Sequence, residues 1–141
     1  MPERVSALGL DVGKRRLGVA GCDGMGLIAT GLTTIERQSF PQDRERLQAW
    51  VAERRARVLV VGLPYCMDGT LGEQARQVQQ FAQRLAKTLE MPLDYVDERL
   101  SSLEAREQLN MAAQPRSRAD KARIDCQAAA IILQQWLDRR R

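Results

Sequence analysis

The chain has 141 residues, 44% of them hydrophobic, and a formal net charge of +4 from 22 Lys and Arg against 18 Asp and Glu. This length predicts one domain, residues 1–141, that buries its own core. The sequence contains no histidine, which excludes Ser-His-Asp and Cys-His catalysis and histidine-liganded zinc. Any catalytic chemistry must therefore rest on carboxylates, lysines or metal ions. The excess of basic over acidic residues favours a polyanionic partner.

The apolar runs are short and interrupted by charges, and the N-terminus lacks the apolar segment of a signal peptide. We therefore expect a cytoplasmic protein that has no membrane partner. Three scattered cysteines, Cys22, Cys66 and Cys126, form no metal-binding pair. We expect them to be reduced and to pack within the fold.

The first part of the chain has the pattern of an antiparallel meander. Two apolar segments, Val5–Val12 and Leu17–Gly21, flank a basic turn and predict a hairpin. Leu27–Ile35 can supply a third strand. The spacing then changes to that of a helix, which we predict over Phe40–Arg54.

Strands and helices alternate in the remainder. In order, we predict a buried strand at Arg57–Pro64, an amphipathic helix at Thr70–Glu90, a strand within Met91–Arg99, a helix opened by the capping box Ser101–Glu104, a basic loop at Ala113–Arg123, and a last helix begun by Asp125. This order predicts an α/β fold with a mixed five-stranded sheet, three antiparallel strands followed by alternating α/β units, flanked by helices.

Three acidic positions stand at the edges of apolar elements. Asp11 lies in the first strand between two glycines of the same face, and Asp125 precedes a turn of alanines. Asp97 and Glu98 end the fifth strand, and only one of them can face the same way as Asp11. Carboxylates from distant points of a chain are the ligands that Mg²⁺ or Mn²⁺ prefers. Taken singly, the same acids also fit a turn, a helix cap and a solvated ion-pair edge.

Four stretches spread over Ala7–Leu137 carry a family resemblance: "LGLDVGKRRLGVAGCD", "VVGLPYCMDGTLG", "VDERLSSLEA" and "IDCQAAAIILQQWL". Together they resemble the YqgF family of small-subunit rRNA precursor nucleases, also called Holliday-junction-resolvase-like proteins. The resemblance implies a single RNase H-like nuclease domain. It also implies that Asp11, Glu98 and Asp125 are the catalytic and metal-binding acids, with Glu98 rather than Asp97 facing inward.

The chain departs from the family pattern at three positions. Arg15 stands where the family often has Lys, and Cys66 stands where it commonly has Asn. Resolvases of the superfamily carry a further acid where this chain has Ala128, so this chain has one carboxylate fewer for a second metal ion.

Basic residues beside the candidate acids are predicted to contact nucleic-acid phosphates: Arg15, Arg16, Arg116, Arg118, Lys121 and Arg123. A solvated charge run is the alternative for this set. The stretch Asp68–Thr70 could bind phosphate at a helix N-terminus or could simply cap that helix.

The resemblance predicts a metal-dependent nuclease that matures the 5′ end of pre-16S rRNA during ribosome biogenesis. We expect it to act as a monomer or homodimer, with precursor rRNA, preribosomal particles or branched DNA as partners. One alternative is a Holliday-junction-resolvase-like DNA nuclease, and a second is a non-catalytic RNA-binding factor of preribosomal particles. A third follows from "DVGKRRLGVA", which is similar to the phosphate-binding hairpin of the actin and sugar-kinase ATPases. Those ATPases need two such domains, and 141 residues supply one.

Overall fold

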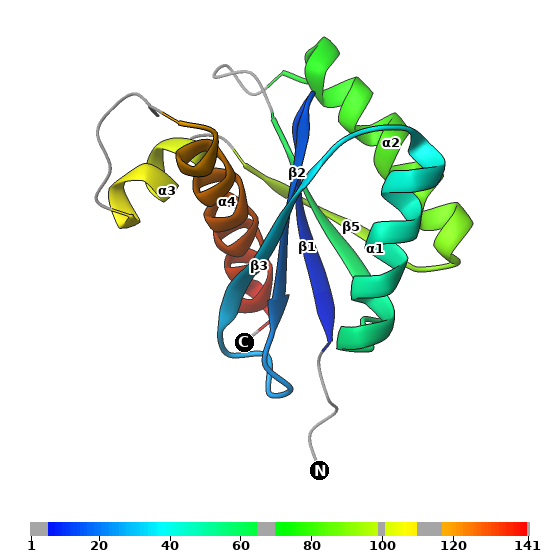
Figure 1. The fold of residues 1–141 in the computed structure, drawn as a ribbon. Helices are drawn as coiled ribbons and strands as arrows, with labels where there is room; N and C mark the ends of the chain where they lie inside the picture. The colour runs from blue at the N-terminus through cyan, green and yellow to red at the C-terminus, as the bar shows by residue number, and fades with distance from the viewer. Residues whose placement is uncertain (1–5, 65–69, 99–100, 110–116, 141) are drawn as a thin grey trace.

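The computed structural model describes residues 6–64, 70–98, 101–109 and 117–140, with residues 101–103 and 106 described by their backbone only. Its elements follow one another as β1 (Ala7–Val12), β2 (Arg16–Cys22), β3 (Ala29–Glu36), α1 (Phe40–Arg54), β4 (Val58–Leu63), α2 (Glu73–Leu89), β5 (Leu93–Asp97), α3 (Ser101–Gln108) and α4 (Arg118–Arg139) (Figure 1).

The strands form one mixed five-stranded sheet in the order β3-β2-β1-β4-β5. Strands β1, β2 and β3 pair antiparallel, whereas β4 lies parallel to both β1 and β5. The turn between β1 and β2 is closed by a hydrogen bond from Gly13 N to Arg16 O at 2.9 Å. The predicted fold class is therefore confirmed.

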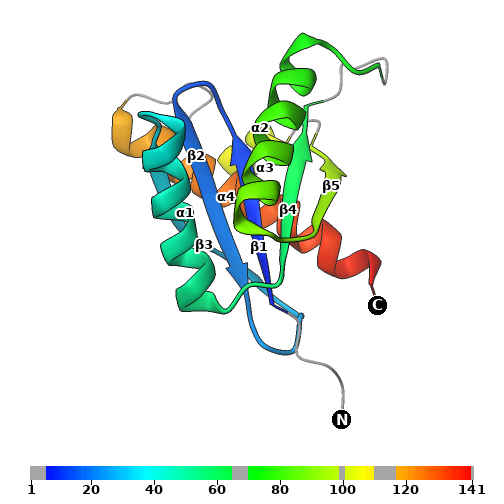
Figure 2. The same ribbon diagram turned by 90° about the vertical axis from the view of Figure 1, so that its right-hand side faces the viewer.

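Helices cover both faces of the sheet. Figures 1 and 2 show α1 and α2 together on one face, with α4 crossing the other and α3 beside α4. Strand β1 serves both layers, because its residues alternate: Leu8, Leu10 and Val12 join the core beneath α1 and α2, and Ala7 joins the core beneath α4. Asp11 therefore faces the α4 side.

Small residues let α4 lie close to the sheet. A Cβ at Gly9 would be 2.8 Å from Leu133 Cβ, and one at Gly31 would overlap Cys126 Sγ. Ala128, Ala129 and Ala130 on the facing helix are buried. At these distances no larger side chain fits between α4 and the sheet. The position of α4 on the sheet is therefore tightly fixed.

The last helix begins earlier than the sequence indicated. Residues 118–123, which we predicted as loop, form the first turns of α4, and Ser117 is its N-cap, with its side chain accepting from Asp120 N at 3.1 Å. The prediction that Asp125 begins this helix is therefore wrong. The basic residues suggested a loop, but Ser117 and Asp120 have the spacing of a capping box.

Two smaller predictions also change or stay open. Helix α2 begins at Glu73 with Gly72 at the N-cap, so the cap position does not belong to Thr70, and Asp68 lies outside the described residues. Cys22 is buried and Cys126 is partly buried, and neither forms a disulfide, whereas Cys66 falls outside the described part. None of the described helices is both long and apolar enough to cross a membrane.

Candidate active site

Asp11 lies near the end of β1 between two glycines of neighbouring strands. Gly18 is its direct partner on β2, and the β1–β4 register, in which Leu10 pairs with Val61, brings Asp11 level with Gly62. Neither neighbour has a side chain that could cover the carboxyl group from the α4 side. The glycines therefore leave space in which groups from other elements approach Asp11.

Glu98 approaches from the end of β5. Its backbone N donates to Leu63 O at 3.1 Å, which continues the parallel pairing of β4 and β5 by one residue. Val96 packs in the core beneath α4, so Glu98, two residues later, faces the same side as Asp11. A Cβ at Gly62 would lie 2.9 Å from Glu98 Cβ. Close approach of Glu98 thus depends on glycine at position 62.

Asp11 and Glu98 are hydrogen-bonded to each other through their carboxyl groups. Burial raises the pKa of Asp11 to about 6, with the hydrogen bond to Glu98 opposing that rise and the charge of Asp125 adding to it. Burial, the charge of Asp11 and the same hydrogen bond raise the pKa of Glu98 to about 9. At neutral pH the pair therefore retains one proton, which the two carboxyl groups share through their hydrogen bond.

Asp125 comes from α4, two turns from the N-cap, and the helix backbone at this point passes directly over Gly18. A Cβ at Gly18 would overlap the carbonyl oxygen of Asp125. The Asp125 carboxylate itself turns to Arg16, whose Nε donates to Asp125 Oδ2 at 2.6 Å. Their side chains are 23% and 21% exposed, so this ion pair is well shielded from solvent.

The basic residues predicted to contact phosphates fall into different environments. Arg15 is exposed in the β1–β2 turn, and Arg16 is engaged by Asp125. Arg118 and Lys121 are exposed on α4, seven and four residues before Asp125, and so form one stripe with it. Arg123 is exposed toward β3, and Arg116 lies outside the described residues.

The donor chemistry fits a hard divalent cation, because the candidate ligands are carboxylates without sulfur or nitrogen. The hydrogen-bonded pair Asp11–Glu98 brings two of them to one point. The third, Asp125, acts on Asp11 through its charge but is bonded to Arg16. Within the described residues, no three His, Cys, Asp or Glu side chains are gathered closely enough to hold a metal ion. Asp125 would have to leave Arg16 to join the pair.

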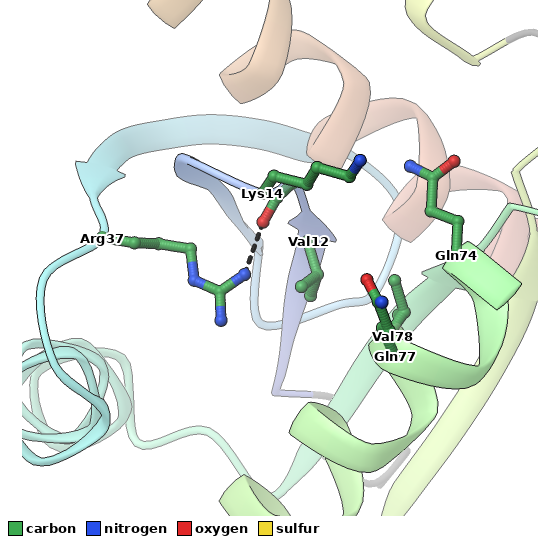
Figure 3. A pocket seen from close by; sticks show the side chains of 7 residues that line it. Val12, Lys14, Arg37, Gln74, Gln77 and Val78 are labelled. Atoms are coloured by element: carbon green, nitrogen blue, oxygen red, sulfur yellow. Dashed lines mark hydrogen bonds between the residues drawn. The ribbon is translucent and has the colours of Figure 1, made fainter.

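Sequence reasoning overlooked two cations at the same end of the sheet. Lys14 and Arg37 line a pocket on the other side of β1 from Asp11, together with Gln74 and Gln77 of α2 (Figure 3). The basic turn that contains Lys14 was visible in the sequence. Its proximity to Arg37 was not, because this contact depends on how β3 ends beside the turn.

Comparison with known proteins gives the family. The sequence profile described as "RuvX: Holliday junction resolvase" matches residues 5–139. The chain belongs to the RuvX family. Similar curated proteins, each named "Putative pre-16S rRNA nuclease", come from Rippkaea orientalis (66% identity over 140 residues, 99% of each chain) and Crocosphaera subtropica (64% over 139 residues, 99% of this chain and 96% of the relative).

Solved structures resemble this RuvX-family chain in fold. Thermus thermophilus RuvC in complex with a Holliday junction substrate has a TM-score of 0.57 at 15% identity, covering 96% of this chain and 95% of that one. The yeast mitochondrial Holliday junction resolvase Ydc2 has a TM-score of 0.54 at 12% identity, covering 97% and 79%. At these identities the likeness shows a shared fold alone. The matching profile and the curated relatives carry the names of nucleases, which are hydrolases of phosphodiester bonds.

Proposed function

We propose that this chain hydrolyses phosphodiester bonds of precursor 16S rRNA, using a divalent metal ion held by Asp11, Glu98 and Asp125. The observation that supports the proposal is the pairing of Asp11 with Glu98 beside the side-chain-free positions Gly18 and Gly62, with Asp125 of α4 near enough to act on Asp11 through its charge. High identity to relatives that bear the rRNA nuclease name supports the choice of substrate.

The chain's own residues have distinct roles in this proposal. Asp11 and Glu98 share a proton in a hydrogen bond, and the loss of that proton leaves two carboxylates with no positive charge between them. A bound Mg²⁺ or Mn²⁺ supplies charge neutralisation at the scissile phosphate and activation of a water molecule. Arg16 holds Asp125 in place in the absence of that ion.

Binding of the substrate rests on the cations around the acids. Arg15 in the turn and Arg118 and Lys121 on α4 are exposed and lie toward the end of the sheet that carries the acids. Their phosphate contacts supply affinity that does not depend on base sequence. The same contacts would hold rRNA either free or within a preribosomal particle.

A four-way DNA junction is the second candidate substrate. It is favoured by the description of the matching family and by the fold shared with two junction resolvases. The same three carboxylates would serve either nucleic acid, since both reactions cleave a phosphodiester bond. The choice between the substrates therefore requires an assay of both.

The deciding experiment compares wild type with Asp125→Asn and Asp138→Asn in Mg²⁺ on precursor 16S rRNA and on a four-way DNA junction. We expect Asp125→Asn to lower the cleavage rate by orders of magnitude, because it removes a negative charge from the proposed metal ligands. Asp138→Asn makes the same chemical change at the exposed end of α4 and should cleave as wild type does.

RNA affinity measured in EDTA should survive Asp125→Asn, since the cations supply it. Equal cleavage rates in wild type and Asp125→Asn would contradict the role of Asp125. Absence of cleavage by wild type on both substrates would favour the alternative of a non-catalytic RNA-binding factor.

A further inference from the structure

A small polar pocket lies on the opposite side of β1 from Asp11. Val12, the residue after Asp11, points into it, and the pocket has a volume of about 120 Å³ (Figure 3). Its lining consists of Val12, Gly13, Lys14, Arg37, Gln74, Gln77 and Val78. It adjoins the β1–β2 turn but is separated by β1 from the three carboxylates.

The lining has the chemistry of an anion site. It combines two cationic side chains with two amides that can donate hydrogen bonds, and no acid is among the described residues that line it. The buried side chains of Val12 and Val78 contribute its apolar part. Two like charges facing one small hollow repel each other, and an anion between them relieves that repulsion.

Arg37 is held in position before any ligand arrives. Its Nη1 donates to Gly13 O at 2.6 Å, and its guanidinium carbon lies 4.6 Å from the centre of the Phe81 ring. Its Nε also forms an ion pair with the buried Asp43, whose Oδ2 lies 3.9 Å away, a distance too long for a hydrogen bond. A guanidinium has five N–H donors, so this fixed group retains donors for a ligand.

Lys14 supplies the mobile partner of this arrangement. It is exposed, and its side chain extends from the turn toward Gln74 of α2 (Figure 3). Among the described residues it takes part in no ion pair. An ammonium group with three donors on a flexible stem is suited to contact a phosphate as a point charge.

We propose that this pocket binds a backbone phosphate of the nucleic-acid strand that passes the three carboxylates. The assignment rests on the proposed function. Lys14 follows Asp11 by three residues, and the exposed Arg15 lies in the same turn between β1 and β2. A strand that leaves the acids across this turn therefore reaches the pocket next.

The surface beyond the pocket continues this path. A larger hollow of about 610 Å³ shares Lys14, Arg37 and Gln77 with the pocket and extends along α2 to Arg84. Arg84 is stacked on Phe40, with its guanidinium carbon 3.8 Å from the ring centre. Among the described residues that line this hollow, Asp43 is the one acid, and it is buried beside Arg37. The pocket is thus the first part of a basic track that leads away from the acids.

The first test uses inorganic phosphate and nuclear magnetic resonance, in EDTA. Titration into the wild-type protein should shift the side-chain amide signals of Gln74 and Gln77 and the backbone amide of Gly13. The same titration of Lys14→Gln should leave them unshifted, while Lys87→Gln, near the far end of α2, should behave as wild type. Absence of these shifts in the wild type would overturn the assignment.

The second test measures RNA affinity against salt concentration, again in EDTA so that no cleavage is required. Lys14→Gln should flatten the slope of log affinity against log salt by about 0.7 for single-stranded RNA. Lys87→Gln removes the same charge from an exposed site outside the pocket and should not flatten it. Gln77→Phe fills the pocket without changing charge and should weaken binding severalfold.

The outcomes separate this inference from the proposed function. RNA binding with equal slopes in Lys14→Gln and Lys87→Gln, or with full affinity in Gln77→Phe, would overturn the pocket assignment and leave the nuclease proposal intact. Shifts with inorganic phosphate but no effect of the variants on RNA would mean that the pocket takes free phosphate, which overturns the strand assignment. If the wild-type protein binds no RNA, both the pocket assignment and the nuclease proposal are contradicted.

Discussion

At the scale of single residues, the hydrogen bond between Asp11 and Glu98 couples the site to stability. Both acids have pKa values above their ordinary range, to about 6 and about 9, chiefly because they are buried. Between the unfolded and folded pKa values the native state therefore binds more protons than the unfolded state. Stability from this pair is present at low pH and is lost as the pH rises through those folded values.

We therefore expect the free energy of unfolding, measured in EDTA by urea denaturation, to fall between pH 5 and pH 9. Glu98→Gln keeps a hydrogen-bond donor and carries no charge, so at pH 8 it should be more stable than wild type by about 1 kcal/mol or more. Glu107→Gln, an exposed glutamate on α3, is the matched control and should leave stability unchanged. A wild-type stability that does not vary with pH would contradict the shared proton.

A second residue-scale prediction concerns Arg16. Because its guanidinium is bonded to Asp125, its removal frees that carboxylate and takes a positive charge away from the acids. We expect Arg16→Gln to bind Mn²⁺ severalfold more tightly than wild type, as measured by calorimetry. Arg15→Gln loses the same charge in the neighbouring exposed position and should change the affinity much less. Equal effects of the two variants would mean that only local net charge matters.

At the scale of elements, the site depends on how closely α4 lies on the sheet. The backbone of Asp125 contacts β2 at Gly18, and Thr34 Oγ1 of β3 donates to Ala122 O of α4 at 2.6 Å. Helix α4 is thereby fixed at the level of Asp125 by two strands. A substitution in the sheet at this point would therefore move Asp125, a candidate catalytic residue, without replacing any acidic residue.

Gly18→Ala tests this dependence. Its Cβ would overlap the carbonyl oxygen of Asp125, a backbone atom that cannot move aside without shifting α4. We expect a loss of about 2 kcal/mol in the free energy of unfolding and a weaker affinity for Mn²⁺. Gly24→Ala, at an exposed turn position without positive φ, should alter neither. Wild-type stability in Gly18→Ala would show that α4 is free to adjust.

Local sequence patterns predicted the helices and strands better than they predicted the contacts between them. Helix α1 has the predicted bounds, because its apolar spacing is regular, Pro41 lies in its first turn, and the side chain of Ser39 caps it. Glu98 and Asp11 meet only through the parallel pairing of β4 with both β1 and β5. The bond between Arg16 and Asp125 joins residues 109 positions apart. No local pattern encodes such contacts, and family resemblance alone selected Glu98 over Asp97.

At the scale of the whole molecule, the position of the cations matters more than the net charge of +4. Lys14 lies in the β1–β2 turn beside α2 (Figure 3). Lys121 lies in the first turns of α4, the helix that covers the other face of the sheet (Figure 1). Asp125 lies about one helical turn beyond Lys121 on α4, and Asp11 lies three residues before Lys14. A nucleic-acid strand that crosses the acid end of the sheet would contact both lysines.

The double variant Lys14→Gln/Lys121→Gln tests this arrangement against a control of identical net charge, Lys87→Gln/Arg139→Gln, in which both changes lie in the last turns of α2 and α4. Phosphate contacts at distant sites should add, so the first variant should flatten the salt slope for single-stranded RNA by about 1.4 units. The control should keep the wild-type slope, because its residues lie away from the strand. If both doubles flatten the slope equally, the affinity arises from overall charge, and no defined path crosses the acids.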